Sequence, residues 1–315
     1  MFDWTILMVP LAILAIASLV RFVGCDMLTG LDEFEIAPPV EPGVHRSRWP
    51  LNGTADDVEG GHSGIFVSEA MAENAPGQSP PAAGTSDPNA DGLLQEAYPG
   101  AKSLRVDGGW VHVDFHADLN GAQFTVMGWV QPEWDPNELL SNGQRPFRTV
   151  IASRDTFGGV KGFAVMAGPP PNDATGPFQW QVWAGNGDPD WPPAAKVIGP
   201  PVDFSTFPMG EAQTTFLAVA CDGSEVKLYV GPDASNQTIY SKVVPGNQGP
   251  NGQGYVPNPS KPLYIGMGAP EDYENPQNRN PAFPFKGRLQ EFKVYDTALP
   301  TDDIVQMGMF EFFGA

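Results

Sequence analysis

Residues 124–130, Phe-Thr-Val-Met-Gly-Trp-Val, carry the clearest fold signal in the chain. The segment is apolar at every position except Thr125 and Gly128, so apolar side chains would point to both faces of an extended strand. Strands that are buried on both faces have such continuous apolar runs, and β-branched and aromatic residues favour them. We therefore predict that this segment is an inner strand of a sheet that is covered on both sides.

Other strand-like segments lie on both sides of this run. Val111, Val113 and Phe115 alternate with polar residues, as in a half-buried strand. Short apolar runs separated by turn residues predict further strands over residues 149–153, 162–166, 178–183, 215–221, 226–230 and 262–266. The pattern is typical of an all-β protein.

Two local signals predict how elements are joined and closed. Asp222-Gly223 between two of these segments is typical of a β-hairpin turn. Thr301 is expected to cap a short helix, because Asp302 and Asp303 would then lie in its first turn, where the helix dipole favours negative charge.

The composition excludes several classes of protein. Glycine and proline number 36 and 34 of 315 residues while charged residues make up only 17%, which excludes a helical bundle or coiled coil. The chain has 37 acidic and 17 basic residues, and the resulting formal charge of −20 argues against nucleic acid as a partner. The two cysteines, Cys25 and Cys221, are expected to stay unpaired.

Several segments carry a family resemblance: 49–61 (WPLNGTADDVEGG), 104–108 (LRVDG), 124–132 (FTVMGWVQP), 220–231 (ACDGSEVKLYVG), 262–266 (PLYIG) and 285–300 (FKGRLQEFKVYDTALP). Their order resembles the laminin-G-like branch of the concanavalin A-like lectin/glucanase superfamily, over about residues 46–308. The resemblance implies a two-sheet antiparallel jelly-roll sandwich. It implies no single function, because this fold hosts lectins, adhesion modules, glycosidases and spacers.

Residues 1–25 are predicted to be a membrane anchor helix. Residues 4–20 carry no charge, and a helix over residues 4–25 would reach about 33 Å, enough for a bilayer core of about 30 Å. Trp4 suits the interface, Pro10 is tolerated in a membrane helix, and Arg21 can extend its charge to the surface. The segment is thus expected to make the chain a single-pass membrane protein.

Two alternatives for this segment stay open. The residues Phe22-Val23-Gly24-Cys25 resemble a lipoprotein signal, in which Cys25 would be acylated. A cleaved secretory signal is the other alternative, although no basic residue precedes the apolar run. The one flanking basic residue, Arg21, does not fix the orientation, and we expect the globular domain on the extracytoplasmic side, periplasmic or extracellular.

The rest of the chain is predicted to contain a tether and one domain. Residues 26–45 are acidic and punctuated by proline, which predicts an extended tether. Residues 46–315 form the predicted sandwich domain, with a long surface loop at about residues 72–92, where proline, alanine, glycine and serine are frequent.

The sequence offers little catalytic chemistry. Glu133, Asp135 and Glu138 have an E-x-D-x-x-E spacing, and retaining glycosidases use two carboxyl groups about 5 Å apart on a rigid element. The motif follows Pro132 and is interrupted by Pro136, so it is not expected to continue a strand. We predict that the protein is not an enzyme and that it needs no cofactor.

Metal ligation is only weakly indicated. Asp56 and Asp57 in a glycine-rich turn are candidates for a structural Ca²⁺ site, although acids are also ordinary turn residues. His112, Asp114 and His116 would share one strand face, but together they span about 13 Å, too far for one ion. A solvated strand face is the preferred interpretation of these three residues.

Two functions follow as hypotheses. The first is a non-catalytic structural accessory subunit that docks onto a larger integral membrane protein complex, with the tail residues Phe310, Phe312 and Phe313 covering a neighbour or finishing the domain's own core. The alternative is a membrane-tethered glycan-binding module at the cell surface, with Trp191, Trp183 and Trp134 stacking on sugar rings where they are exposed.

Overall fold

The structure, a computed structural model, describes residues 45–67, 85–91, 93, 101–155, 160–188, 195–204, 212–231, 238–244, 254–268 and 283–313. These residues all belong to one compact unit, Glu41–Gly314. The predicted anchor lies outside the described residues, as does the predicted tether apart from His45. Among the described residues, no helix has the length and apolar character that crossing a bilayer requires.

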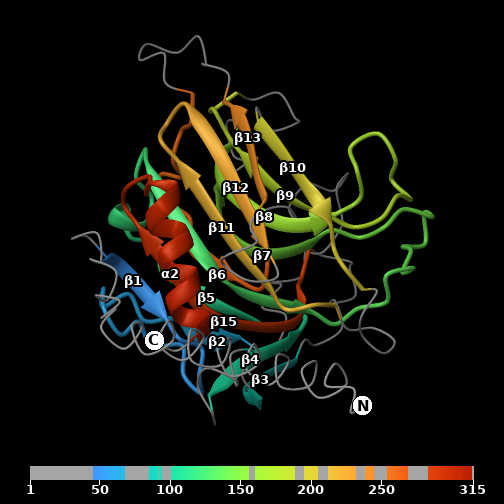
Figure 1. Ribbon diagram of the computed structural model, residues 1–315, viewed down its shortest axis with the longest axis horizontal. Helices are drawn as coiled ribbons and strands as arrows, with labels where there is room; N and C mark the ends of the chain where they lie inside the picture. Colours follow the sequence, from blue (N-terminus) through green and yellow to red (C-terminus); the bar gives the residue numbers. More distant parts are fainter. Residues whose placement is uncertain are drawn as a thin grey trace, which may run out of the picture. The chain divides into compact units, whose positions relative to one another are not determined.

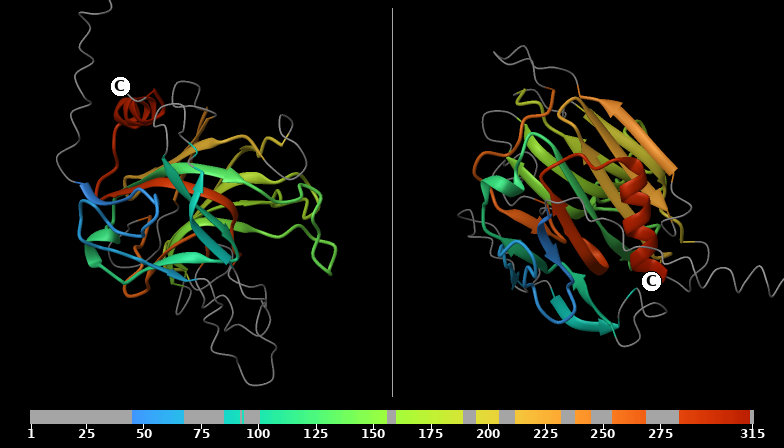
Figure 2. Two further views of the ribbon diagram at one scale, coloured as in Figure 1. Left: turned by 90° about the horizontal axis from the view of Figure 1, so that it is seen from below. Right: turned by 60° about the vertical axis from the view of Figure 1, so that its left-hand side comes forward.

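The described residues form two antiparallel sheets (Figures 1 and 2). Seven strands of the larger, eight-stranded sheet lie in the order β13 (Thr238–Val243), β12 (Glu225–Gly231), β11 (Thr215–Cys221), β6 (Phe124–Pro132), β15 (Lys286–Tyr295), β4 (Lys102–Asp107) and β3 (Thr85–Asp91). The eighth strand, β1 (His45–Trp49), pairs with β15 outside this order. The seven-stranded sheet has the order β10 (Ala195–Pro201), β9 (Gln179–Ala184), β8 (Lys161–Gly168), β7 (Arg148–Asp155), β14 (Leu263–Ile265), β5 (Trp110–Val113) and β2 (Ile65–Val67).

Strand β6 is an inner strand of the larger sheet, as predicted. It pairs with β11 on one side and with β15 on the other, and all nine of its residues are buried. Phe124, Val126 and Val130 face the main core between the sheets, whereas Met127 and Trp129 belong to a second apolar cluster. The continuous apolar run thus reflects burial on both faces.

Helix α2 (Thr301–Phe313) covers the outer face of the larger sheet (Figure 2). Its residues Ile304 and Met307 pack in the same cluster as Trp129 and Phe216. The predicted helix is confirmed, with Asp302 and Asp303 in its first turn. Thr301 is the first helical residue, and its hydroxyl lies 3.1 Å from that of Tyr229.

The predicted strands and hairpin are confirmed, but the structure also contains strands that were not predicted, one of them within a predicted loop. The end of the expected surface loop at residues 72–92 is the edge strand β3, in which Pro88 lies where the register shifts. The edge strands β10 and β13 were not predicted. The Asp222-Gly223 turn joins β11 and β12, with Gly223 at a φ of +93°.

Two connections between the sheets contain the residues of the candidate site. Residues 50–64 lead from β1 in the larger sheet to β2 in the smaller one. Residues 114–123, which include the 3₁₀ turn η1 (Ala117–Leu119), lead from β5 in the smaller sheet to β6 in the larger. We call these segments the first and the second crossover.

Candidate metal centre

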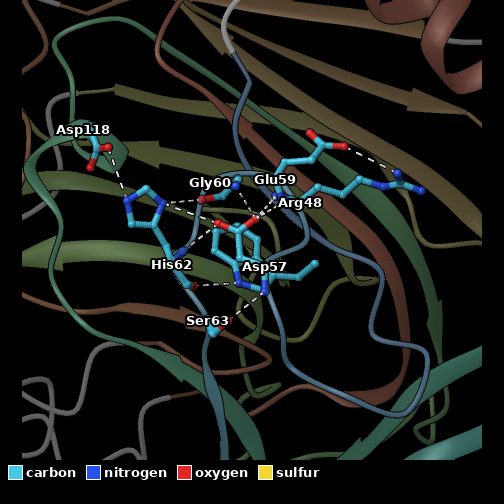
Figure 3. A network of polar contacts seen from close by, with 9 residues as sticks. Arg48, Asp57, Glu59, Gly60, His62, Ser63 and Asp118 are labelled. Atoms are coloured by element: carbon cyan, nitrogen blue, oxygen red, sulfur yellow. Dashed lines mark hydrogen bonds and ion pairs between the residues drawn. The ribbon is translucent and has the colours of Figure 1, made fainter.

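Asp57 organises the first crossover (Figure 3). Its Oδ1 accepts hydrogen bonds from the backbone N–H groups of Arg48, Glu59 and Gly60, at 2.8, 3.0 and 2.9 Å. Its Oδ2 accepts one from the backbone N–H of His62 at 2.9 Å. Burial acts to raise the pKa of Asp57, but the hydrogen bonds from Ser47, Gly60, Arg48 and His62 outweigh it and hold that pKa below its usual range.

Hydrogen bonds hold His62 at its backbone N–H, at its backbone carbonyl and at one ring nitrogen. Its backbone N–H donates to Asp57, and its backbone carbonyl accepts from the Trp49 indole N–H at 3.1 Å. Its Nδ1 lies 2.7 Å from the Ser47 hydroxyl oxygen. The side chain is only 10% exposed, so the ring has a fixed position at the edge of the core.

The hydrogen bonds around Ser47 assign the protons of a neutral His62 ring. An ionised Asp57 only accepts, so the Ser47 hydroxyl donates to it. The one hydroxyl proton is then used, and Ser47 accepts from Nδ1–H of His62. The Nε2 atom of a neutral His62 ring therefore carries a lone pair.

The second crossover brings two further donors to this nitrogen. Oδ2 of Asp118 lies 3.3 Å from Nε2 of His62 (Figure 3), and the ring centroids of His62 and His116 lie 4.2 Å apart. The turn is closed by the carbonyl of His116, which accepts from the backbone N–H of Leu119 at 3.1 Å, and it is anchored by the buried Leu119 side chain. One donor atom from each of His62, His116 and Asp118 lies within 4.8 Å of the other two, so these residues could hold a metal ion.

The predicted Ca²⁺ ligands have other roles. The oxygens of Asp57 face hydrogen-bond donors, whereas a cation requires them as free acceptors. Asp56 is exposed, and its backbone N–H lies 3.4 Å from the Thr54 hydroxyl. Asp57 therefore stabilises the turn through hydrogen bonds.

The three polar residues predicted to share a strand face separate in the structure. His112 lies 3.2 Å from Asp114 and packs against the ring of Tyr264. His116 lies beyond the end of β5 and contacts His62. The chain contains only four histidines, which was the one available hint, but neither His62 nor Asp118 was singled out because their meeting depends on the two crossovers.

The carboxyl groups of the E-x-D-x-x-E motif are engaged in ion pairs and a turn. The Glu133 carboxylate accepts from Nε of Arg105 at 2.6 Å and from Nε of Arg288 at 2.8 Å. Asp135 accepts from the backbone N–H of Asn137, and Glu138 pairs with Arg148. Each of these carboxyl groups has a structural partner.

Two of the predicted stacking residues are buried. Trp134 is 1% exposed and lies edge-on to Phe178 and Phe285. Trp183 is 4% exposed, with Nζ of Lys196 4.3 Å from its ring centroid. Stacking on a sugar requires an exposed ring face, a condition that neither ring meets.

The remaining predicted site residues lie outside the described part of the chain. Trp191 and the four anchor residues, Trp4, Pro10, Arg21 and Cys25, are among them. Phe310, Phe312 and Phe313 lie in helix α2. The structure describes their backbone but not their side chains.

Comparisons with known proteins show similarity only at the level of structure. No family model and no curated protein matches the chain. Domain 4 of AbnA, a GH43 extracellular arabinanase from Geobacillus stearothermophilus solved in complex with arabinotriose, matches 84% of this chain and 98% of its own, with 17% identity and a TM-score of 0.46.

Two binding domains also match. The binding domain of Paraclostridial Mosquitocidal Protein 1 has 12% identity and a TM-score of 0.49, over 84% of this chain and 51% of its own. The binding domain of botulinum neurotoxin serotype D has 12% identity and a TM-score of 0.48, over 85% and 51%. The chain thus spans about half the length of these two domains. At such identities the likeness concerns a sandwich-like β fold and no function.

Proposed function

We propose that this chain is a non-catalytic accessory subunit, anchored in a membrane by its N-terminal segment, whose laminin-G-like sandwich docks onto a larger membrane protein complex. The observation that supports the non-catalytic part of the proposal is the double ion pair of Glu133. A glycosidase acid or nucleophile has to approach the substrate, whereas the Glu133 carboxylate is 7% exposed and bound by two guanidinium groups.

The sequence before the domain supports the docking part of the proposal. Residues 4–20 are uncharged and apolar, which suits a bilayer. Residues 26–44 contain five acidic residues, Asp26, Asp32, Glu33, Glu35 and Glu41, and no lysine or arginine. A tether of this kind suits a basic surface on the partner, because opposite charges favour association.

Native membranes, extracted in a gentle detergent and fractionated by size, test the proposal. We expect the full-length chain to comigrate in fixed stoichiometry with a larger assembly, identified by mass spectrometry. Changing the five tether acids to their amides is expected to weaken comigration, and the matched control exchanges Asp for Glu and Glu for Asp at the same positions, which preserves the charge.

A lone chain in detergent would contradict the subunit proposal. Binding of that lone chain to a glycan array would then support the second hypothesis, a tethered glycan-binding module. That hypothesis now depends on Trp191 among the three tryptophans, because Trp134 and Trp183 are buried.

A further inference from the structure

We propose that His62, His116 and Asp118 form a binding site for one divalent transition-metal ion, with Zn²⁺ as the ion that these donors suit best. Two imidazole nitrogens and one carboxylate oxygen are a common ligand set for zinc. Calcium and magnesium prefer oxygen ligands alone, so the two histidines argue against them. The inference is independent of the proposed function and holds for a subunit or a glycan-binding module.

The spacing of the donor atoms suits a small tetrahedral ion. With zinc–ligand bonds of about 2.0–2.1 Å, neighbouring ligand atoms are about 3.3 Å apart. Nε2 of His62 and Oδ2 of Asp118 already lie 3.3 Å apart. All three donor atoms lie within 4.8 Å of one another. The donor nitrogen of His116 therefore has to move toward the other two atoms by no more than about 1.5 Å to reach this spacing.

Ser47 and Asp57 complete the arrangement as an outer shell. Metal-bound histidines usually donate their other ring N–H to an oxygen, which fixes the ring and raises its basicity. The chain from His62 through Ser47 to the buried Asp57 supplies this support before any ion binds. Asp118 is 42% exposed, so water can reach a fourth coordination position.

Metal content of the full-length chain tests the site. The purified chain is stripped with a chelator, dialysed against Zn²⁺ and analysed by mass spectrometry of the metal, and we expect one zinc per chain. Asp118→Asn and His116→Ala are expected to lower the affinity at least tenfold. His112→Ala and Asp114→Asn are the matched controls, because they remove the same residue types from the neighbouring pair, and they should bind zinc as the unchanged chain does.

Cobalt substitution gives a second readout. We expect the visible absorption of tetrahedral Co²⁺ in the unchanged chain and its loss in Asp118→Asn. Thermal unfolding of each metal-free variant checks the fold, and if His116→Ala does not fold, the exposed Asp118 decides the outcome. Absence of stoichiometric zinc would overturn the proposal, as would equal loss of zinc in the His112 and Asp114 controls.

Discussion

At the scale of single residues, the Glu133 carboxylate lies between two guanidinium groups, those of Arg105 and Arg288. We predict that Glu133→Gln lowers the free energy of unfolding by about 1–2 kcal/mol, because two charge-assisted hydrogen bonds are weakened and Arg105 is partly exposed to water. Urea unfolding measures this change. The control Asp135→Asn keeps an acceptor for Asn137 and should change stability by no more than about 0.5 kcal/mol.

Cys221 provides a second prediction at this scale. Its thiol is free and buried, and burial raises its pKa from 9.0 to about 12, which leaves about a thousandfold less thiolate. We expect Cys221 in the folded chain to resist iodoacetamide at pH 8 and to react at once in denaturant. Peptide mapping separates it from Cys25, and rapid labelling of Cys221 in the folded chain would show that its environment is more open.

Single residues also show the limit of sequence reasoning. The predicted strand over residues 215–221 is confirmed, and Cys221 at its end is buried like the apolar residues before it. The turn role of Asp57 and the meeting of His62 with Asp118 were not predictable. Hydrogen bonds and contacts between segments depend on how the crossovers fold, and residue spacing along the chain does not contain that information.

At the scale of elements, two glycines with a similar positive φ allow the effect of backbone strain to be measured separately from that of a steric clash. Gly162 in β8 and Gly143 in a turn have φ of +75° and +79°. A Cβ on Gly162 would lie 1.9 Å from the Ser153 carbonyl oxygen, whereas a Cβ on Gly143 would meet nothing within 4 Å.

We therefore predict that Gly162→Ala lowers the free energy of unfolding by about 2–5 kcal/mol, because the clash with Ser153 adds to the strain. Gly143→Ala carries the strain alone and should lower it by about 1 kcal/mol. Urea denaturation of the two variants measures both values, and equal losses would contradict the close approach of β8 to β7.

Elements differ in how well the sequence predicts them. The inner strand β6 was predicted because burial on both faces leaves a continuous apolar run. The edge strands β3, β10 and β13 were missed because edges tolerate proline and polar residues, as at Pro88 in β3 and Pro200 in β10. The switch of β15 from β4 to β1 was also missed, since it occurs at a bulge around Glu291, which has a φ of +52°.

At the scale of the whole domain, a metal ion held by His62, His116 and Asp118 would join the two crossovers that link the sheets. A ligand that binds only the folded chain stabilises it, by about 2.7 kcal/mol at 100 times its Kd. We predict that zinc at this excess raises the free energy of unfolding of the unchanged chain by that amount. Asp118→Asn, with an affinity at least tenfold lower, should show no more than about half of this gain at the same zinc concentration, and an equal gain in both chains would mean that zinc acts elsewhere.

Anomalous diffraction above the zinc absorption edge, from crystals of the chain grown with equimolar zinc, tests the metal centre most directly. We predict one strong peak between Nε2 of His62, the His116 ring and the Asp118 carboxylate, with the Ser47 hydroxyl still bonded to Nδ1 of His62. No peak at this position, or the main peak between His112 and Asp114, would contradict the metal centre.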